Sequence, residues 1–117
     1  MPPPSGVGGL LYFYPHMILY NVTINVEDSV HQEWLSWMKE IHIPEVMKTA
    51  RFTSSRIFRV LGDEDSGGKT YSVQYSCNSM NEFLEYERNH AQALRAEHTA
   101  KFKDKVVSFR TLLESVD

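Results

Sequence analysis

The sequence has only one cysteine, Cys77, so no internal disulfide can form. It also lacks an apolar run of the roughly 20 residues that a membrane-spanning helix needs. Its formal net charge is -3, so it has no excess of positive charge for nucleic acid or for an anionic membrane surface. These absences predict a protein of the reducing cytoplasm that binds neither nucleic acid nor membrane.

Proline and glycine are scarce except near the start of the chain. The stretch MPPPSGVGGLLYFYPH, residues 1–16, holds four of the five prolines and three of the six glycines. Regular alternation of apolar and polar residues begins directly after Met17. We therefore expect residues 1–16 to be a non-native or flexible N-terminal extension. We expect residues 17–117 to form a single domain, because their number and apolar content suit one modest core.

Periodicity predicts four strands and two helices in that domain. Residues 18–26 alternate with a period of two, which is typical of a strand with one buried face. The pairs Ser29–Gln32 and Ser79–Glu82 resemble capping boxes, and apolar residues recur at helical spacing after each. Pro44 predicts that the first helix ends near His42. The strands are expected at 18–26, 53–61, 69–77 and 105–114, and the helices at 29–42 and 79–103, with a break or bend near 89–91.

The order of these elements predicts an α+β, ferredoxin-like βαββαβ fold, with a four-stranded antiparallel sheet and both helices on one face. Alternation places one set of side chains beneath the helices: Tyr20, Val22, Ile24, Tyr71, Val73 and Tyr75. The opposite face then carries Asn21, Thr23, Asn25, Ser72 and Gln74. Because this face is uncovered, we expect two copies to stack through it into a homodimer, a dimeric α+β barrel. The polarity of the face is the argument against a dimer.

Histidine supplies the main candidates for a site. His90 falls between Phe83 and Leu94 on an apolar stripe, where an imidazole could act as a general base. A hydrogen-bonded core histidine is the alternative. His98 lies on the same side of the second helix, and His42 lies at the edge of the first. Further candidates for the lining of a pocket are Trp34, Trp37, Tyr71 and Phe83, although aromatic residues at helical spacing more often only fill a core.

Other chemistries find little support in the residues. Metal binding through His42, Glu45 or His98 remains a weak hypothesis, since no pair of histidines has a metal-site spacing. No phosphate loop, dinucleotide fingerprint or nucleophile elbow is present, so we predict no cofactor. The strand KTYSVQY resembles an RNA-recognition motif, but its tyrosines share the apolar face that must meet the helices. Nucleic acid is therefore not an expected partner.

From Met17 onward the chain closely resembles a bacterial domain-of-unknown-function family, number 4286. The likeness rests on three stretches: MILYNVTINVEDSVHQEWLSWMKEIHIPEVM, GDEDSGGKTYSVQYSC and AEHTAKFKDKVVSFRTLLE. More loosely, NEFLEYERNHAQAL is similar to the second helix of antibiotic-biosynthesis monooxygenases and their haem-degrading relatives, which are dimeric α+β barrels. That resemblance implies a pocket between helices and sheet, with the family histidine at His90 and the haem degraders' asparagine at Asn21.

Two hypotheses follow. The first is an uncharacterised homodimeric binding or regulatory module of bacterial cytoplasm without assignable catalysis, which takes a small-molecule ligand. The alternative is a cofactor-independent monooxygenase or haem-degrading-type enzyme that uses His90. The haem degraders' tryptophan is missing, because Met80, Phe83 and Tyr86 occupy the stretch ahead of His90.

Overall fold

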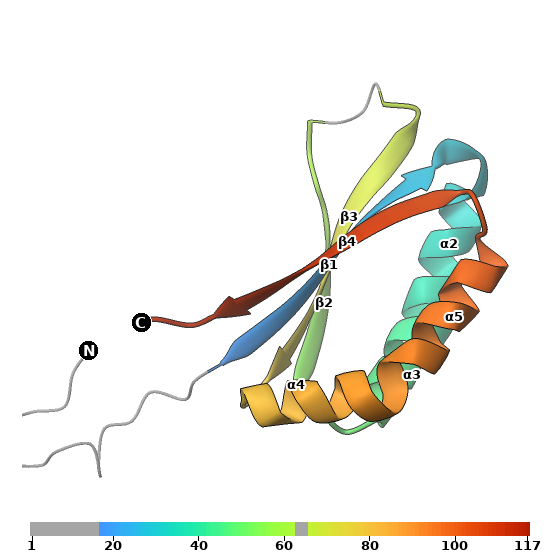
Figure 1. Ribbon diagram of the computed structural model, residues 1–117. Helices are drawn as coiled ribbons and strands as arrows, with labels where there is room; N and C mark the ends of the chain where they lie inside the picture. The colour runs from blue at the N-terminus through green and yellow to red at the C-terminus, as the bar shows by residue number, and fades with distance from the viewer. Residues whose placement is uncertain (1–16, 63–65) are drawn as a thin grey trace, which may run out of the picture.

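The computed structural model describes residues 17–62 and 66–117, so the expectation about residues 1–16 lies outside the described part. Four strands form one antiparallel sheet in the order β2-β3-β1-β4. The helices lie together on one face of this sheet (Figure 1). The predicted ferredoxin-like βαββαβ fold is therefore confirmed. The strands are β1 (Ile18–Glu27), β2 (Ser54–Arg59), β3 (Gly68–Cys77) and β4 (Val106–Glu114).

The first helical segment continues past Pro44, so the prediction that it ends near His42 is wrong. A 3-10 turn, η1 (Asp28–Val30), leads into α2 (His31–Trp37), then the π-turn η2 (Met38–His42) and α3 (Ile43–Lys48). Proline lacks an N–H, and its ring clashes with the carbonyl four residues earlier in a regular α-helix. The wider π-turn directly before Pro44 changes that spacing. The chain can thus remain helical.

The second helical segment has the predicted irregularity. It consists of α4 (Met80–Tyr86), the π-turn η3 (Glu87–Ala91) and α5 (Gln92–Lys101). Figure 1 shows α4 and α5 running in clearly different directions. The π-turn shifts the helical phase, which explains why the apolar stripe of the sequence drifts between the two halves.

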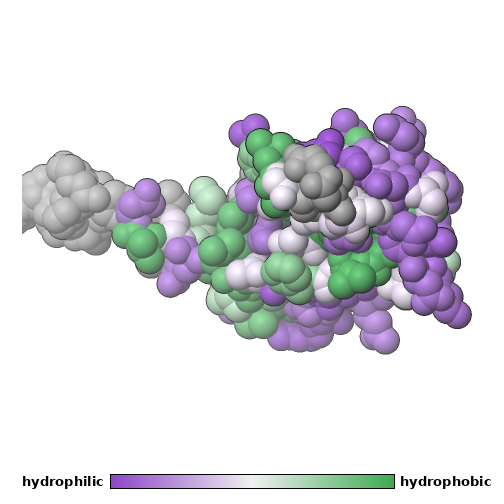
Figure 2. All heavy atoms as spheres, turned by 90° about the horizontal axis from the view of Figure 1, so that it is seen from above, coloured by the Kyte–Doolittle hydropathy of each residue, from purple (hydrophilic) through white to green (hydrophobic). Residues whose placement is uncertain are grey.

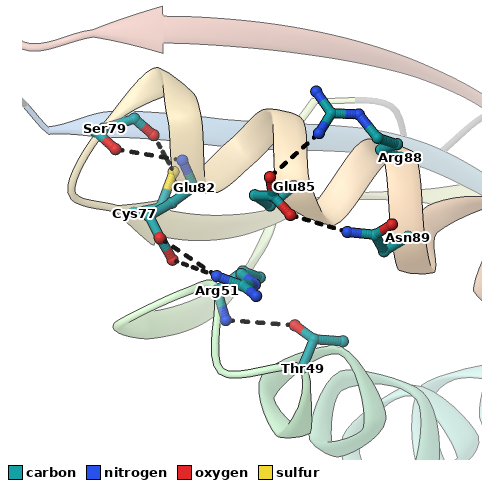
Figure 3. Close-up of polar contacts among 8 residues, drawn as sticks. All are labelled: Thr49, Arg51, Cys77, Ser79, Glu82, Glu85, Arg88 and Asn89. Atoms are coloured by element: carbon teal, nitrogen blue, oxygen red, sulfur yellow. Dashed lines mark hydrogen bonds and ion pairs between the residues drawn. The ribbon is translucent and has the colours of Figure 1, made fainter.

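The two predicted capping boxes had opposite outcomes. Ser79 is the N-cap of α4, and its hydroxyl accepts a hydrogen bond from the backbone N–H of Glu82 at 3.2 Å (Figure 3). Ser29 caps no helix, because it lies inside the 3-10 turn and Val30 occupies the N-cap position of α2. The Ser29 hydroxyl instead donates to the carboxylate of Glu27 at 2.6 Å.

Side chains alternate across the sheet as the sequence predicts. Tyr71 and Tyr75 are only 6% and 2% exposed, so they lie beneath the helices and not in water. Asn21 points to the other face, where its side-chain oxygen accepts a hydrogen bond from Ser72. The core of the described residues is apolar and includes Ile18, Tyr20, Ile24, Val26, Trp34, Trp37, Met38, Val46, Phe52, Val73, Cys77, Phe83, Tyr86 and Phe102.

The helical side of the surface is mostly hydrophilic, whereas hydrophobic residues gather toward the strands (Figure 2). Several of the exposed apolar residues belong to β4, including Val107, Phe109 and Leu113. No helix built from residues 17–62 and 66–117 combines the length and apolar character needed to cross a membrane.

Candidate ligand-binding site

A cavity of about 40 Å³ lies between the helices and the inner face of the sheet. Apolar residues such as Val22, Ile24 and Val73 supply part of its wall. Polar side chains reach it from β1, β3 and β4 and from both helical segments. They are Tyr20, His42, Tyr75, Tyr86, Arg95, His98, Ser108 and Arg110. A cavity with apolar walls and a few convergent polar groups is typical of small-molecule sites.

The hydroxyl of Tyr20 joins two guanidinium groups at this cavity. It accepts a hydrogen bond from Nη2 of Arg95 at 2.9 Å and another from Nε of Arg110 at 3.0 Å. Tyr20 is on β1, Arg95 on α5 and Arg110 on β4, so this contact connects three elements. Arg110 reaches the inner side because it pairs with Val22 in the β1–β4 register, and paired residues share a face.

The two arginines differ in their charge partners. Glu87 of η3 receives two hydrogen bonds from Arg95 and forms an ion pair with it. Burial lowers the pKa of Arg95, but the hydrogen bonds to Glu87 and Tyr20 outweigh burial, and its pKa is raised above its ordinary value. Arg110 has no carboxylate partner in the described part of the chain. Arg110 is, however, exposed to solvent, so its charge is carried at the surface end of the lining.

Two histidines meet on the helical side of the cavity. The ring centroids of His42 and His98 lie 5.8 Å apart. Burial, with a smaller effect of His98, lowers the pKa of His42 to about 4. Burial, followed by the charge of Arg110, also lowers the pKa of His98. At neutral pH His42 is thus uncharged, and its imidazole has one donor and one acceptor nitrogen.

The π-turn η2 determines where His42 lies. His42 stacks on Trp37 with ring centroids 5.0 Å apart. In a regular α-helix, side chains five residues apart point about 140° away from each other. The π-turn has a wider repeat, which brings this pair to one side. A local irregularity therefore turns His42 toward the cavity.

Polar atoms at the cavity are only partly satisfied. Nε1 of Trp34 donates to Nε2 of His98 at 2.9 Å, which fixes the orientation of that ring. By contrast, Nδ1 of His42 and Nε of Arg95 are buried and have no hydrogen-bond partner among the described residues. Burying such a group without a partner costs about 1–3 kcal/mol. Both residues line the cavity, whereas Arg51, whose Nε is also buried without a partner among the described residues, does not.

Of the histidines that the sequence singles out, His90 is not among the described residues that line the cavity. It is half-buried, and its ring stacks on Tyr86 at 6.4 Å between centroids. It lies instead along a shallow outer groove between α3 and α5 with Glu45 and Glu97. His90 is thus one side chain removed from the cavity, and its catalytic role stays an untested prediction.

The other candidates divide into two groups. His42 and His98 line the cavity, as a pocket role requires. Trp34, Trp37, Tyr71 and Phe83 belong to the core around it. Among the described residues, no group of three His, Cys, Asp or Glu side chains could hold a metal ion, which leaves the hypothesis of a metal bound by His42, Glu45 or His98 without a complete ligand set.

Sequence reasoning missed Tyr20, Arg95 and Arg110 as members of a site. Arg95 and Arg110 lie 75 and 90 positions from Tyr20, so local periodicity cannot reveal these contacts. A signal was available on β4, where Arg110 occurs at the same parity as Val106 and Leu112. An arginine on the inner face of a strand indicates a polar contact beneath the helices.

This combination of fold and cavity defines the class of the protein: an α+β ferredoxin-like domain with a pocket between its helices and its sheet. The sequence matches the family described as Domain of unknown function (DUF4286) over residues 17–116. The chain therefore belongs to this family, as its sequence indicated. The comparison with curated proteins gave no match.

Solved structures with the same fold share little sequence with the chain. A conserved protein of unknown function from Bacteroides thetaiotaomicron VPI-5482, described as a possible oxidoreductase, has a TM-score of 0.63 at 13% identity, covering 87% of this chain and 100% of that one. A Bacillus cereus protein, named by inference as an antibiotic biosynthesis monooxygenase, has a TM-score of 0.61 at 14% identity, covering 87% and 95%.

A third similar structure is a dimeric ferredoxin-like protein of unknown function from Thermobifida fusca YX. Its TM-score is 0.54 at 15% identity, covering 88% of this chain and 96% of that one. At such low identity, these three likenesses establish the fold alone. The local chemistry of the cavity must therefore be argued from this chain's own residues.

Proposed function

We propose that this protein is a homodimeric binding module of the bacterial cytoplasm that holds a small molecule between its helices and its sheet. The observation that carries the proposal is the pair of orphan polar atoms, Nδ1 of His42 and Nε of Arg95, on residues that line one cavity. Native cores leave few buried donors or acceptors without partners, and two of the three in the described residues belong to the lining of this cavity. A ligand would satisfy both atoms.

A direct test uses the full chain and a fragment library of small acids, amides, alcohols and phenols. Binding is followed by ligand-observed NMR, with His42→Phe as the variant and His90→Phe as its matched control. We expect fragments to bind the wild type and His90→Phe, and to lose affinity for His42→Phe. Failure of every fragment to bind, or equal loss in both variants, would contradict a binding role for this cavity.

The dimer is proposed through the outer face of the sheet. Val107, Phe109 and Leu113 of β4 are 73%, 62% and 47% exposed. They pair in register with Asn25, Thr23 and Leu19, which places them on the face away from the helices. An apolar strip of this kind on one strand favours burial against a second copy.

The polar part of the outer face does not oppose such burial strongly, because its side chains already bond to one another. Ser72 donates to Asn21 at 2.5 Å, and Asn25 donates to Thr70 at 2.9 Å. Gln74 donates to Ser72 at 3.1 Å. Polar groups that are hydrogen-bonded within the chain can be buried at far lower cost than unpaired ones. The objection that the sequence raised is thereby weakened.

Sedimentation or light scattering of the full chain tests the dimer. We expect the wild type to have twice the mass of one chain, and Phe109→Glu to be a monomer. Leu84→Glu is the matched control, since Leu84 is 42% exposed on α4, away from the outer sheet face. A monomeric wild type, or dissociation by Leu84→Glu and not by Phe109→Glu, would contradict the proposed interface.

The enzyme alternative would need a different histidine from the one the sequence indicates. A general base must lie within reach of its substrate. His42, whose imidazole is uncharged at neutral pH and has an unpartnered nitrogen, lies at the cavity, whereas His90 does not. Because the predicted catalytic histidine lies outside the cavity while unpartnered hydrogen-bonding atoms belong to residues that line it, the binding module is the better-supported function.

A further inference from the structure

We infer that the ligand of this cavity is a small monoanionic carboxylate, of the size of formate, acetate or glycolate. This inference rests on the proposed binding function and adds the chemical class of the ligand. Three features of the cavity support it: the sign of its charge, the kind of polar atom left without a partner, and its volume.

Charge is the first feature. Arg95 and Arg110 line the cavity, and Glu87 neutralises Arg95 by an ion pair. Arg110 is solvent-exposed and has no carboxylate partner in the described part of the chain, while His42 is uncharged at neutral pH. None of the described residues that line the cavity is a carboxylate. A single negative charge on the ligand would match the one cation of the lining that has no carboxylate partner.

The unpartnered atoms are the second feature. The free Nε of Arg95 is a donor under all conditions, because a guanidinium has no acceptor. It therefore needs an oxygen lone pair, which a carboxylate supplies with a charge-assisted hydrogen bond. The free Nδ1 of His42 can donate to the same carboxylate or accept from a neighbouring hydroxyl, depending on its tautomer. Acetate satisfies the first arrangement and glycolate the second.

Volume is the third feature. A cavity of about 40 Å³ is small. One water needs about 10–15 Å³ of such space, so about three water-sized positions are available. That is enough for a carboxylate with one or two carbon atoms and too little for a polycyclic substrate or a haem. The inference thus separates this site from pockets built for large aromatic ligands.

The experiment is isothermal titration of the full chain with sodium formate, acetate and glycolate at constant ionic strength. Acetamide is the neutral probe of the same shape as acetate, and sulfate is the dianion. Arg110→Gln removes the cation that has no carboxylate partner, and Arg88→Gln is the control, because Arg88 is exposed on η3 and does not line the cavity. Circular dichroism of both variants reports whether they fold.

We expect saturable binding of at least one carboxylate with one site per chain, and no binding of acetamide or sulfate. Arg110→Gln should raise Kd about tenfold or more, as expected when the counter-charge of the carboxylate is lost, whereas Arg88→Gln should leave it unchanged. If Arg110→Gln does not fold, thermal unfolding of the wild type tests the inference instead. Its Tm should rise with the bound carboxylate and not with acetamide at equal ionic strength.

Three results would overturn the inference in different ways. Binding of acetamide or phenol in place of the carboxylates, lost in His42→Phe, would refute the ligand class and leave the binding function standing. No binding of any probe by the wild type would refute both. Equal weakening by Arg110→Gln and Arg88→Gln would show that only the general charge of the surface attracts anions, and would also refute the proposed site.

Discussion

The indole Nε1 of Trp34 donates a hydrogen bond to Nε2 of His98 at 2.9 Å and thereby joins α2 to α5 beside the cavity. Because Nε2 accepts this bond, a neutral His98 carries its proton on Nδ1. Trp34 is fully buried, so removing either partner leaves the other unsatisfied in the interior. This pair holds the two helical segments in register above the sheet.

A double-mutant cycle measures that contact. Trp34→Phe and His98→Leu should each destabilise the fold, by about 2–4 kcal/mol for the larger truncation. Together they should cost less than the sum, with a coupling of about 0.5–1.5 kcal/mol, because the second change no longer leaves an unpaired group. Urea unfolding gives the four free energies. Additive effects would mean that the hydrogen bond contributes nothing to stability.

The two serines at the expected helix starts make a matched comparison. Ser79→Ala should lower the free energy of unfolding by about 1 kcal/mol, because it removes the acceptor for the Glu82 N–H (Figure 3). Ser29→Ala should change it by less than about 0.5 kcal/mol, since Ser29 is exposed and its hydroxyl bonds to the exposed Glu27. A larger loss at Ser29 than at Ser79 would contradict the assignment of the caps.

Stability should depend on pH through His42. Its pKa is about 4 in the folded chain, against 6.5 as the ordinary value, so the unfolded chain binds a proton more readily. The wild type should therefore lose stability, relative to His42→Phe, as pH falls from about 6.5 to about 4. The loss should reach about 3 kcal/mol and then level off. Parallel curves of unfolding free energy against pH would show that His42 is not buried as described.

Cys77 should be unreactive in the native protein. Its side chain is fully buried, its thiol donates to the backbone oxygen of Ser79 at 3.5 Å, and burial raises its pKa (Figure 3). The thiolate is the reactive form, so iodoacetamide should label the unfolded chain rapidly and the native chain only as it opens. Mass spectrometry follows both reactions. Rapid, complete labelling of the native chain would place Cys77 at the surface.

Sequence alone predicted the parts of the fold that depend on short-range order. The strand parity of Tyr71 and Tyr75 follows from a period of two, and the Ser79 cap follows from local hydrogen bonding. The prediction that Ser29 caps a helix was wrong because a 3-10 turn moves the helix start, although Ser29–Gln32 and Ser79–Glu82 have the same side-chain pattern. Such a shift of one or two residues leaves little trace in composition.

The candidate site was harder to predict, because it depends on long-range contacts and on helix irregularity. Regular helical spacing turns His90 inward and leaves His42 at an edge. The structure has His42 at the cavity through the π-turn η2, and leaves His90 outside it. Tyr20 meets Arg95 and Arg110 only once the sheet and the second helical segment have come together. These pairings require the tertiary structure.

The central claim is that the cavity beside His42 and His98 is a binding site, and side-chain ¹⁵N NMR tests it most directly. Acetate or glycolate is titrated into labelled full-length protein while the signals of both imidazoles, the Arg95 Nε and the Trp34 indole are followed. We predict saturable shifts of this group with a single Kd, while side chains on the outer face of the sheet stay unchanged. Unmoved imidazole and Arg95 signals at saturating concentrations of both acids would contradict the account.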